Sequence, residues 1–334
     1  MKNFGCLLLF VFFLTSCEQY QPPNKISFAG EAQGTYYAIT YYDAQNRNLK
    51  TQADSLLKAF DQSVSLWVPQ SIISRVNQGD SLVNLDEIFI HNFNLSKQIA
   101  KQTNGYFDFT VSPLVEAWGF SFKEKIVLTK TKIDSIKTLV NWEKVSLQDG
   151  KVIKSDPRIR FDFNAIAQGH SVDLLGQLLE SKGIQSYLVD VGGEIRSKGT
   201  KPDGTKWRIG IEKPSLEAND DRSIQQVIEL QDKSLATSGS YRKYYEENGK
   251  RYSHAIDPKT GYPVTHNLLS VTVIAASAAE ADAYATAFLV MGLEKSKTLI
   301  PQLPAVEAYF ISWDQENGFV IDWTTGFQNY LPHQ

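Results

Sequence analysis

Two oxygen-bearing side chains, Asp282 and Thr286, lie four residues apart in the segment SAAEADAYATAFLVMG. Nearly every other residue of this segment is small or apolar, which predicts a helix buried on all sides. Residues four apart are neighbours on one helix face, with about 5–6 Å between their Cβ atoms. A buried carboxylate must be paired, hydrogen-bonded or bound to a cation, and a carboxylate beside a hydroxyl suits a hard cation such as Mg²⁺. Alternatively, Asp282 pairs with a buried arginine or caps a neighbouring turn.

A second candidate site lies in the segment FDFNAIAQGHSVD, where a predicted strand over residues 159–163 runs into a predicted helix over residues 164–182. Asp162 stands at the end of this strand, and small residues lead into the helix. Free N–H groups point outward at such a helix start and bind phosphate oxygens. Because the segment is not a Walker motif, phosphate binding here is a hypothesis that needs support from the rest of the chain.

A third candidate is the aromatic segment YFDFTVSPLVEAWGF, in which Asp108 is the first acidic residue. Tyr106, Phe107 and Phe109 surround it directly after the helix stop Asn104-Gly105. These rings are either part of the core or faces for a planar heterocycle, since loops often carry binding residues.

Helices and strands are mixed along the chain that must position these residues. Apolar spacing predicts helices over residues 48–65, 85–103 and 130–140. Residues 28–42 predict two strands, with Gly34 marking a bulge or a close backbone approach, and residues 145–155 predict a hairpin turning at Asp149-Gly150. Since strands and helices do not alternate strictly, the prediction is an α+β fold with mixed or antiparallel sheets and flanking helices.

The composition is that of an ordinary globular protein. The 334 residues are 42% hydrophobic and 21% charged, and the formal net charge is −3. No basic block or stripe is present, so the sequence gives no indication of a nucleic-acid partner.

The first residues indicate export and a lipid anchor. Lys2 precedes an apolar run that is too short for a membrane-spanning helix. The run ends in Leu14-Thr15-Ser16-Cys17, which resembles a bacterial lipobox. The alternative is an ordinary signal peptide with a chance cysteine. We expect a signal peptide over residues 1–16, a lipidated Cys17 that begins a tether over residues 17–27, and one domain over residues 28–334. The mature protein would have no free thiol, which excludes cysteine catalysis and a cysteine-based zinc site.

Eight motifs in order resemble the ApbE family of FAD:protein FMN transferases. They are GTYY, SIISRVN, NGYFDFTVSPLVEAWGF, FDFNAIAQGHSVD, DVGGE, SGSY, HAIDPKTGYP and ADAYATA. The resemblance implies that FAD binds with Mg²⁺ on its pyrophosphate and that the FMN half passes to a threonine hydroxyl of a partner protein, with release of AMP. Together with the lipobox at Cys17, it leads us to expect an extracytoplasmic protein, lipid-anchored on the periplasmic side of a bacterial membrane, whose acceptor is a membrane redox subunit.

The resemblance also assigns individual residues. The metal ligands would be the backbone carbonyl of Ala165 and the side chains of Asp282 and Thr286. His254 would accept a proton during transfer, because imidazole titrates near neutral pH; alternatively, it is a structural histidine before a proline turn. The implied FAD contacts are Gln33, Trp67, Tyr106, Phe107, Asp108, Asp162, Gln168 and Ile256.

Three positions depart from the family pattern. Gln168 stands where lysine or glutamate is common, Ile72 where an acid is usual, and Phe109 where proline is frequent. None of them is an implied metal ligand. Two alternative functions remain, namely an FAD pyrophosphatase that uses water in place of threonine, and a lipid-anchored flavin carrier without turnover. The presence of Asp282, Thr286 and His254 argues against the carrier.

Overall fold

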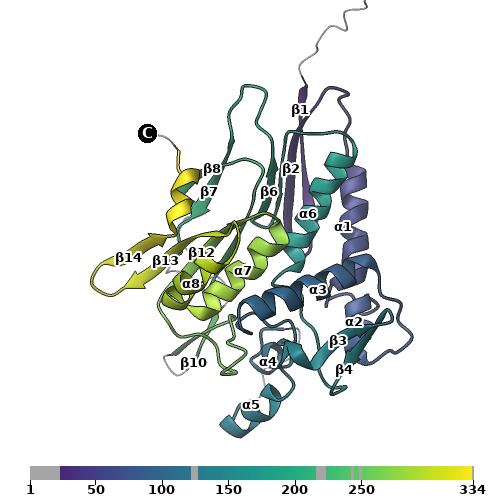
Figure 1. The fold of residues 1–334 in the computed structure, drawn as a ribbon, viewed down its shortest axis with the longest axis vertical. Helices are drawn as coiled ribbons and strands as arrows, with labels where there is room; N and C mark the ends of the chain where they lie inside the picture. Colours follow the sequence, from purple (N-terminus) through teal and green to yellow (C-terminus); the bar gives the residue numbers. More distant parts are fainter. Residues whose placement is uncertain (1–22, 122–126, 216–222, 242–243, 248–249, 333–334) are drawn as a thin grey trace, which may run out of the picture.

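An eight-stranded sheet runs through the molecule in the order β1-β2-β5-β6-β9-β12-β13-β14, and every neighbouring pair is antiparallel (Figure 1). The computed structural model describes residues 23–121, 127–215, 223–241, 244–247 and 250–332. The strands of this sheet are β1 (Asn24–Ala32), β2 (Thr35–Asp43), β5 (Tyr187–Val191), β6 (Glu194–Lys198), β9 (Ser234–Gly239), β12 (Leu268–Ala275), β13 (Glu307–Asp314) and β14 (Gly318–Trp323). Three separate two-stranded sheets are β3 (Val145–Gln148) with β4 (Lys151–Lys154), β7 (Trp207–Glu212) with β8 (Ile224–Leu230), and β10 (Tyr244–Glu247) with β11 (Lys250–Ser253).

Helices cover one face of the large sheet. Helix α6 packs on β5 and β6, and α7 packs on β9 and β12, while α1 and α3 lie against these two helices (Figure 1). The α-helices are α1 (Lys50–Val64), α2 (Ile72–Gln78), α3 (Glu87–Gln102), α4 (Ser112–Ala117), α5 (Lys130–Lys137), α6 (Ala167–Ser181), α7 (Ala278–Met291) and α8 (Leu293–Leu299). Short 3-10 helices are η1 (Trp142–Lys144), η2 (Ile300–Gln302) and η3 (Thr325–Tyr330).

The sheet is buried on both faces at its centre because successive side chains of a strand point to opposite sides. Val271 and Val273 of β12 belong to the core beneath α7. Ile274 of the same strand belongs to a second core, which Trp207 of β7 and Phe327 of η3 complete. The arrangement confirms the predicted α+β fold with antiparallel sheets.

The N-terminal strand begins earlier than the sequence analysis placed it. Strand β1 starts at Asn24 and so includes four residues of the predicted tether, because Ile26 and Phe28 alternate into the core that β1 shares with β2. Gly34 is neither a bulge nor a point of close approach. Gln33 and Gly34, with φ of 54° and 73°, form the two-residue turn between β1 and β2, a turn in which both residues need positive φ.

Residues 159–163 are not a strand, although they alternate as predicted. The side chain of Asn77 replaces a strand partner: its Oδ1 accepts from the N–H of Phe161 at 2.7 Å, and its Nδ2 donates to the Phe161 carbonyl at 2.8 Å. The N–H of Asp162 donates to the Phe109 carbonyl at 2.8 Å. The extended main chain is therefore satisfied without joining a sheet.

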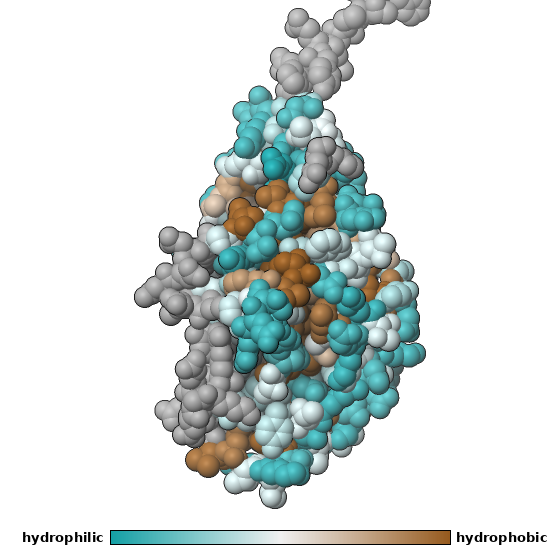
Figure 2. Space-filling view, turned by 90° about the vertical axis from the view of Figure 1, so that its left-hand side faces the viewer, coloured by the Kyte–Doolittle hydropathy of each residue, from teal (hydrophilic) through white to brown (hydrophobic). Residues whose placement is uncertain are grey.

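One face of the molecule carries apolar residues along its middle, with hydrophilic residues around them (Figure 2). It is the side toward which the β13–β14 hairpin extends (Figure 1). No helix in the described parts of the chain is long and apolar enough to cross a membrane. The predicted signal peptide and Cys17 lie outside the described residues.

Candidate active site

The start of α6 meets the side of α7 at Asp282. The N–H of Gly169, in the first turn of α6, donates to Oδ2 of Asp282 at 3.1 Å. Only glycine fits at position 169, because a Cβ atom there would lie 2.2 Å from the carbonyl oxygen of Ala278. Helix α6 has no side-chain cap of its own at Ile166. Asp282 therefore caps α6 from another helix, as the alternative interpretation of this carboxylate proposed.

Capping uses one of the two carboxylate oxygens of Asp282. The side chain is buried, with 6% of the residue exposed. Burial raises the pKa of Asp282 to about 7, although the hydrogen bond from Gly169 acts in the opposite direction. None of the ion pairs found among the described residues involves Asp282. The other part of the alternative, a buried arginine partner, thus finds no support in the described chain, and a cation would meet an uncompensated carboxylate here.

The other two proposed metal ligands lie close by along the same elements. Ala165 immediately precedes the N-cap residue of α6, two residues before the helix begins. Thr286 lies one turn after Asp282 on α7, and its hydroxyl is 3.1 Å from that of Ser238 on β9. The described residues contain no cluster of three or more His, Cys, Asp or Glu side chains that could hold a metal. A cation here would rely on one carboxylate with neutral oxygen donors, which Mg²⁺ accepts when water or substrate completes its shell.

Gln33 and Gln168 are brought to the same helix start. Gln168 is the second residue of α6, and its Nε2 donates to the Val191 carbonyl at 3.1 Å. The Ser171 hydroxyl donates to Oε1 of Gln33 at 3.3 Å. Nε2 of Gln33 is buried and has no partner in the described structure. Because a buried donor without a partner costs free energy, this N–H group is suited to donate a hydrogen bond to an acceptor atom of a bound ligand.

The aromatic loop contacts the segment of Asp162. Asp108 is buried, and its carboxylate accepts from the N–H and hydroxyl of Thr110 at 2.8 and 2.6 Å and from the N–H of Trp142 at 3.0 Å. Burial raises the pKa of Asp108. Phe107 is a core residue. Both side chains therefore stabilise the loop from within the protein, Asp108 through its hydrogen bonds and Phe107 through packing in the core.

Asp162 is half-buried beside this loop. Its Oδ1 accepts from the N–H of Asn164 at 2.8 Å. Burial raises the pKa of Asp162 to about 6, with a further contribution from the charge of Glu116 and an opposite one from the Asn164 hydrogen bond. A carboxylate so perturbed in a candidate site is a candidate for ligand contact.

Three predicted site residues lie on other segments. Trp67 is 64% exposed, an unusual position for so large an apolar side chain. Ile256 is buried with Trp118, so a ligand contact from Ile256 would involve its main chain. The ring of His254 is half-buried and lies edge-on to Phe120, with centroids 6.4 Å apart. A hydrogen bond between the N–H of Val264 and the Ala255 carbonyl, 2.9 Å, closes the loop after His254.

Asp173 is a buried residue of this region that the sequence analysis did not single out. Its two oxygens accept from the first N–H groups of α7, those of Ala278 and Ala279, both at 3.0 Å. The guanidinium of Arg196 also pairs with it at 2.9 Å. Asp173 lies four residues after Gly169, so one face of α6 holds α7 at two successive turns. The four-residue spacing of Gly169 and Asp173 in the motif FDFNAIAQGHSVD was the sequence feature that could have indicated this contact.

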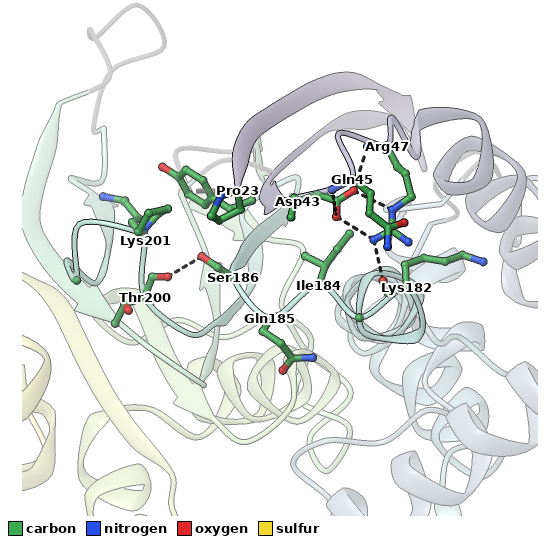
Figure 3. Close-up of a pocket in the computed structure, with 15 residues that line it drawn as sticks. Pro23, Asp43, Gln45, Arg47, Lys182, Ile184, Gln185, Ser186, Thr200 and Lys201 are labelled. Atoms are coloured by element: carbon green, nitrogen blue, oxygen red, sulfur yellow. Dashed lines mark hydrogen bonds and ion pairs between the residues drawn. The ribbon is translucent and has the colours of Figure 1, made fainter. Parts of the chain in front are cut away.

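A hollow of about 640 Å³ lies at the opposite end of α6, about 22 Å away along the 15-residue helix. Pro23, Asp43, Arg47, Lys182 and Lys201 are among its lining residues. Figure 3 shows Lys182 and Lys201 on opposite sides, pointing away from each other. None of the predicted site residues lines this hollow, so it is separate from the candidate active site.

Fold and site together define a class of protein: an antiparallel α+β domain in which a buried carboxylate caps a helix start from a neighbouring helix and keeps one oxygen for a cation, an arrangement suited to a phosphate held through that cation. A family model described as the ApbE family matches residues 33–310. The chain belongs to the ApbE family, which confirms the resemblance drawn from its motifs.

Curated relatives and solved structures agree with this membership. The chain is 36% identical over 304 residues to the FAD:protein FMN transferase of Vibrio cholerae, covering 88% of this chain and 89% of that protein. It is also 36% identical over 311 residues to that of Escherichia coli, covering 88% of each. The flavin transferase ApbE from Vibrio cholerae has a TM-score of 0.82 at 32% identity, covering 93% of this chain and 100% of that one. The apo flavinyl transferase ApbE of Pseudomonas stutzeri has a TM-score of 0.83 at 30% identity, covering 95% and 99%.

Proposed function

We propose that this protein transfers the FMN portion of FAD to a threonine hydroxyl of another protein and releases AMP. The observation that carries the proposal is the buried Asp282 carboxylate, which faces the first turn of α6 without a cationic side chain beside it in the described chain. The names of the relatives support flavin transfer to a protein. Mg²⁺ as the cation and threonine as the acceptor are parts of the proposal.

The donor set fits Mg²⁺. Asp282 offers one carboxylate oxygen beyond the one bound to Gly169, Thr286 offers a hydroxyl, and Ala165 offers a main-chain carbonyl before α6. All three are hard oxygen donors. When bound, the ion would neutralise the pyrophosphate charge that grows as AMP leaves.

The remaining steps fall to the protein. The Nε2 group of Gln33, buried without a partner in the described structure, would bind a phosphate oxygen, while the exposed ring of Trp67 would hold the flavin or adenine ring. The acceptor hydroxyl attacks the FMN phosphorus, a new P–O bond forms, and the P–O bond to AMP breaks. His254 would accept the hydroxyl proton and later return it to solvent. Positioning does most of the work in such phosphoryl transfers.

Two further parts of the proposal concern location and partner. We infer that Cys17 carries the lipid that holds the protein at the periplasmic side of a bacterial membrane. The acceptor would then be a redox subunit of the same membrane. Strand β1 begins at Asn24, seven residues after Cys17, so the lipid would join the domain through a short tether at the end of α6 away from the active site.

The test is to incubate the full chain with FAD, Mg²⁺ and a candidate acceptor. Flavin fluorescence retained on the acceptor in a denaturing gel, with AMP released in equal amount, is the expected result. Free FMN with AMP and no labelled acceptor would show the pyrophosphatase, and FAD binding without AMP would show the carrier. Asp282→Ala should abolish transfer, whereas the matched control Asp203→Ala, in the exposed turn after β6, should keep it.

A further inference from the structure

Two lysines converge on the ring of Tyr106. Nζ of Lys259 lies 4.3 Å from the ring centroid, and Nζ of Lys295 lies 4.8 Å from it. Lys295 also donates to the Tyr106 hydroxyl at 2.7 Å. The two lysines come from different elements, the loop after His254 and helix α8. The half-buried ring of Tyr106 thus lies against two positive charges.

One carboxylate, that of Asp257, partly compensates these positive charges by acting on Lys295 without forming an ion pair with it among the described residues. Both lysines are exposed, and neither takes part in an ion pair found in the described parts of the chain. Their nitrogens lie within about 9 Å of each other, since each approaches the same ring. Two like charges this close repel each other modestly in water. An anion between or beside them would remove that repulsion.

The end of helix α5 lies beside the same loop and adds the half-buried Lys137. The loop of Lys259 passes over the end of α5, because a Cβ atom on Gly261 would lie 2.8 Å from Cδ of Lys137. Tyr262 of this loop is 40% exposed. We call Lys137, Lys259 and Lys295, together with the two tyrosine rings, the lysine surface. Aromatic rings and long aliphatic stems supply contact area beside the charges.

The lysine surface adjoins the elements of the candidate active site. Its central loop directly follows His254 and Ile256, Tyr106 leads into the Asp108 loop, and α8 follows the helix of Asp282. An acceptor hydroxyl must approach the FMN phosphate at this site. Residues on either side of that hydroxyl would then lie across neighbouring surface.

We propose that the lysine surface binds an acidic segment of the acceptor protein next to the residue that receives FMN. This inference rests on the proposed function for the identity of the partner, and on charge complementarity for its chemistry. Such complementarity raises the rate of encounter and selects among partners. The effect would weaken with salt because Lys259 and Lys295 are exposed.

The probes are two synthetic peptides that carry one threonine flanked by glutamates or by glutamines. Binding to the full chain is measured by fluorescence anisotropy at low and at physiological salt. The glutamate peptide should bind roughly tenfold more tightly at low salt, as expected for two or three exposed charge contacts. The double variant Lys259→Gln/Lys295→Gln should lose this preference, and the control Lys58→Gln/Lys151→Gln, with two exposed lysines of α1 and β4, should keep it.

FAD affinity, followed by flavin fluorescence, separates the explanations. It should change less than twofold in the Lys259→Gln/Lys295→Gln variant. Equal binding of the two peptides to wild-type protein would overturn the proposal, and a tenfold loss of FAD affinity would assign the lysines to FAD instead. Peptide binding and FAD binding are both measured without any reaction. Failure of FMN transfer in the gel assay would therefore refute the proposed function without changing either affinity.

Discussion

Asp173→Asn should loosen the contact that positions the candidate metal ligand. The substitution keeps the size of a buried side chain but removes the charge that pairs with Arg196 at 2.9 Å and accepts two N–H groups of α7. Breaking a buried ion pair costs about 3–5 kcal/mol. Glu180 still pairs with Arg196 at 3.0 Å, so we expect a loss of roughly 3 kcal/mol in the free energy of unfolding, the lower end of that range.

Glu180→Gln is the matched control, because it also removes an ion pair with Arg196, whereas Glu180 makes no hydrogen bond to α7 in the described structure. Glu180 is more exposed than Asp173, and we expect a loss of about 1 kcal/mol or less. Urea unfolding measures both losses, and the Mg²⁺ concentration for half-maximal FMN transfer measures the position of Asp282. That concentration should rise in Asp173→Asn and stay unchanged in Glu180→Gln. Equal losses of stability, or an unchanged Mg²⁺ requirement in Asp173→Asn, would refute the coupling.

Three further outcomes are expected. Asp282→Asn should remove the thermal stabilisation that Mg²⁺ gives the wild-type protein in differential scanning fluorimetry, and a stabilisation that persists would place the ion elsewhere. Burial raises the pKa of Asp162 from 3.8 to about 6, so the folded state binds this proton more tightly than the unfolded state does. The free energy of unfolding should therefore decrease as the pH rises from about 4 to about 6. Asp162→Asn should flatten this part of the pH profile measured by urea unfolding. Cys17→Ser should release the protein from membranes in cell fractionation, and unchanged membrane association would exclude the lipid anchor.

Local patterns predicted the elements that are stabilised locally. The segment of Asp282 and Thr286 forms α7 and is buried on nearly all sides, as its small and apolar residues indicated. The Asp149-Gly150 hairpin also forms as expected. In both, the residues that decide the structure are neighbours in the sequence, either one helical turn apart or on either side of a turn.

Contacts between distant segments explain what the patterns missed. Residues 159–163 alternate like a strand, but Asn77, 84 positions away, supplies both hydrogen bonds that a neighbouring strand would make at Phe161. A local pattern records which side chains are buried and does not record which group satisfies the main chain. Asp173 escaped notice for the same reason, since the N–H groups it accepts from lie 105 and 106 residues further along.

The observed cap and the proposed metal site would use different oxygens of Asp282. Helix α6 begins without a side-chain cap of its own, and Oδ2 of Asp282, 113 residues away, accepts from its Gly169 N–H. This bond restrains the carboxylate through one oxygen and leaves Oδ1 for the proposed cation. A ligand held in advance loses less entropy when a cation binds. The cap therefore need not compete with the proposed metal site, because it restrains the side chain and leaves its second oxygen for the ion.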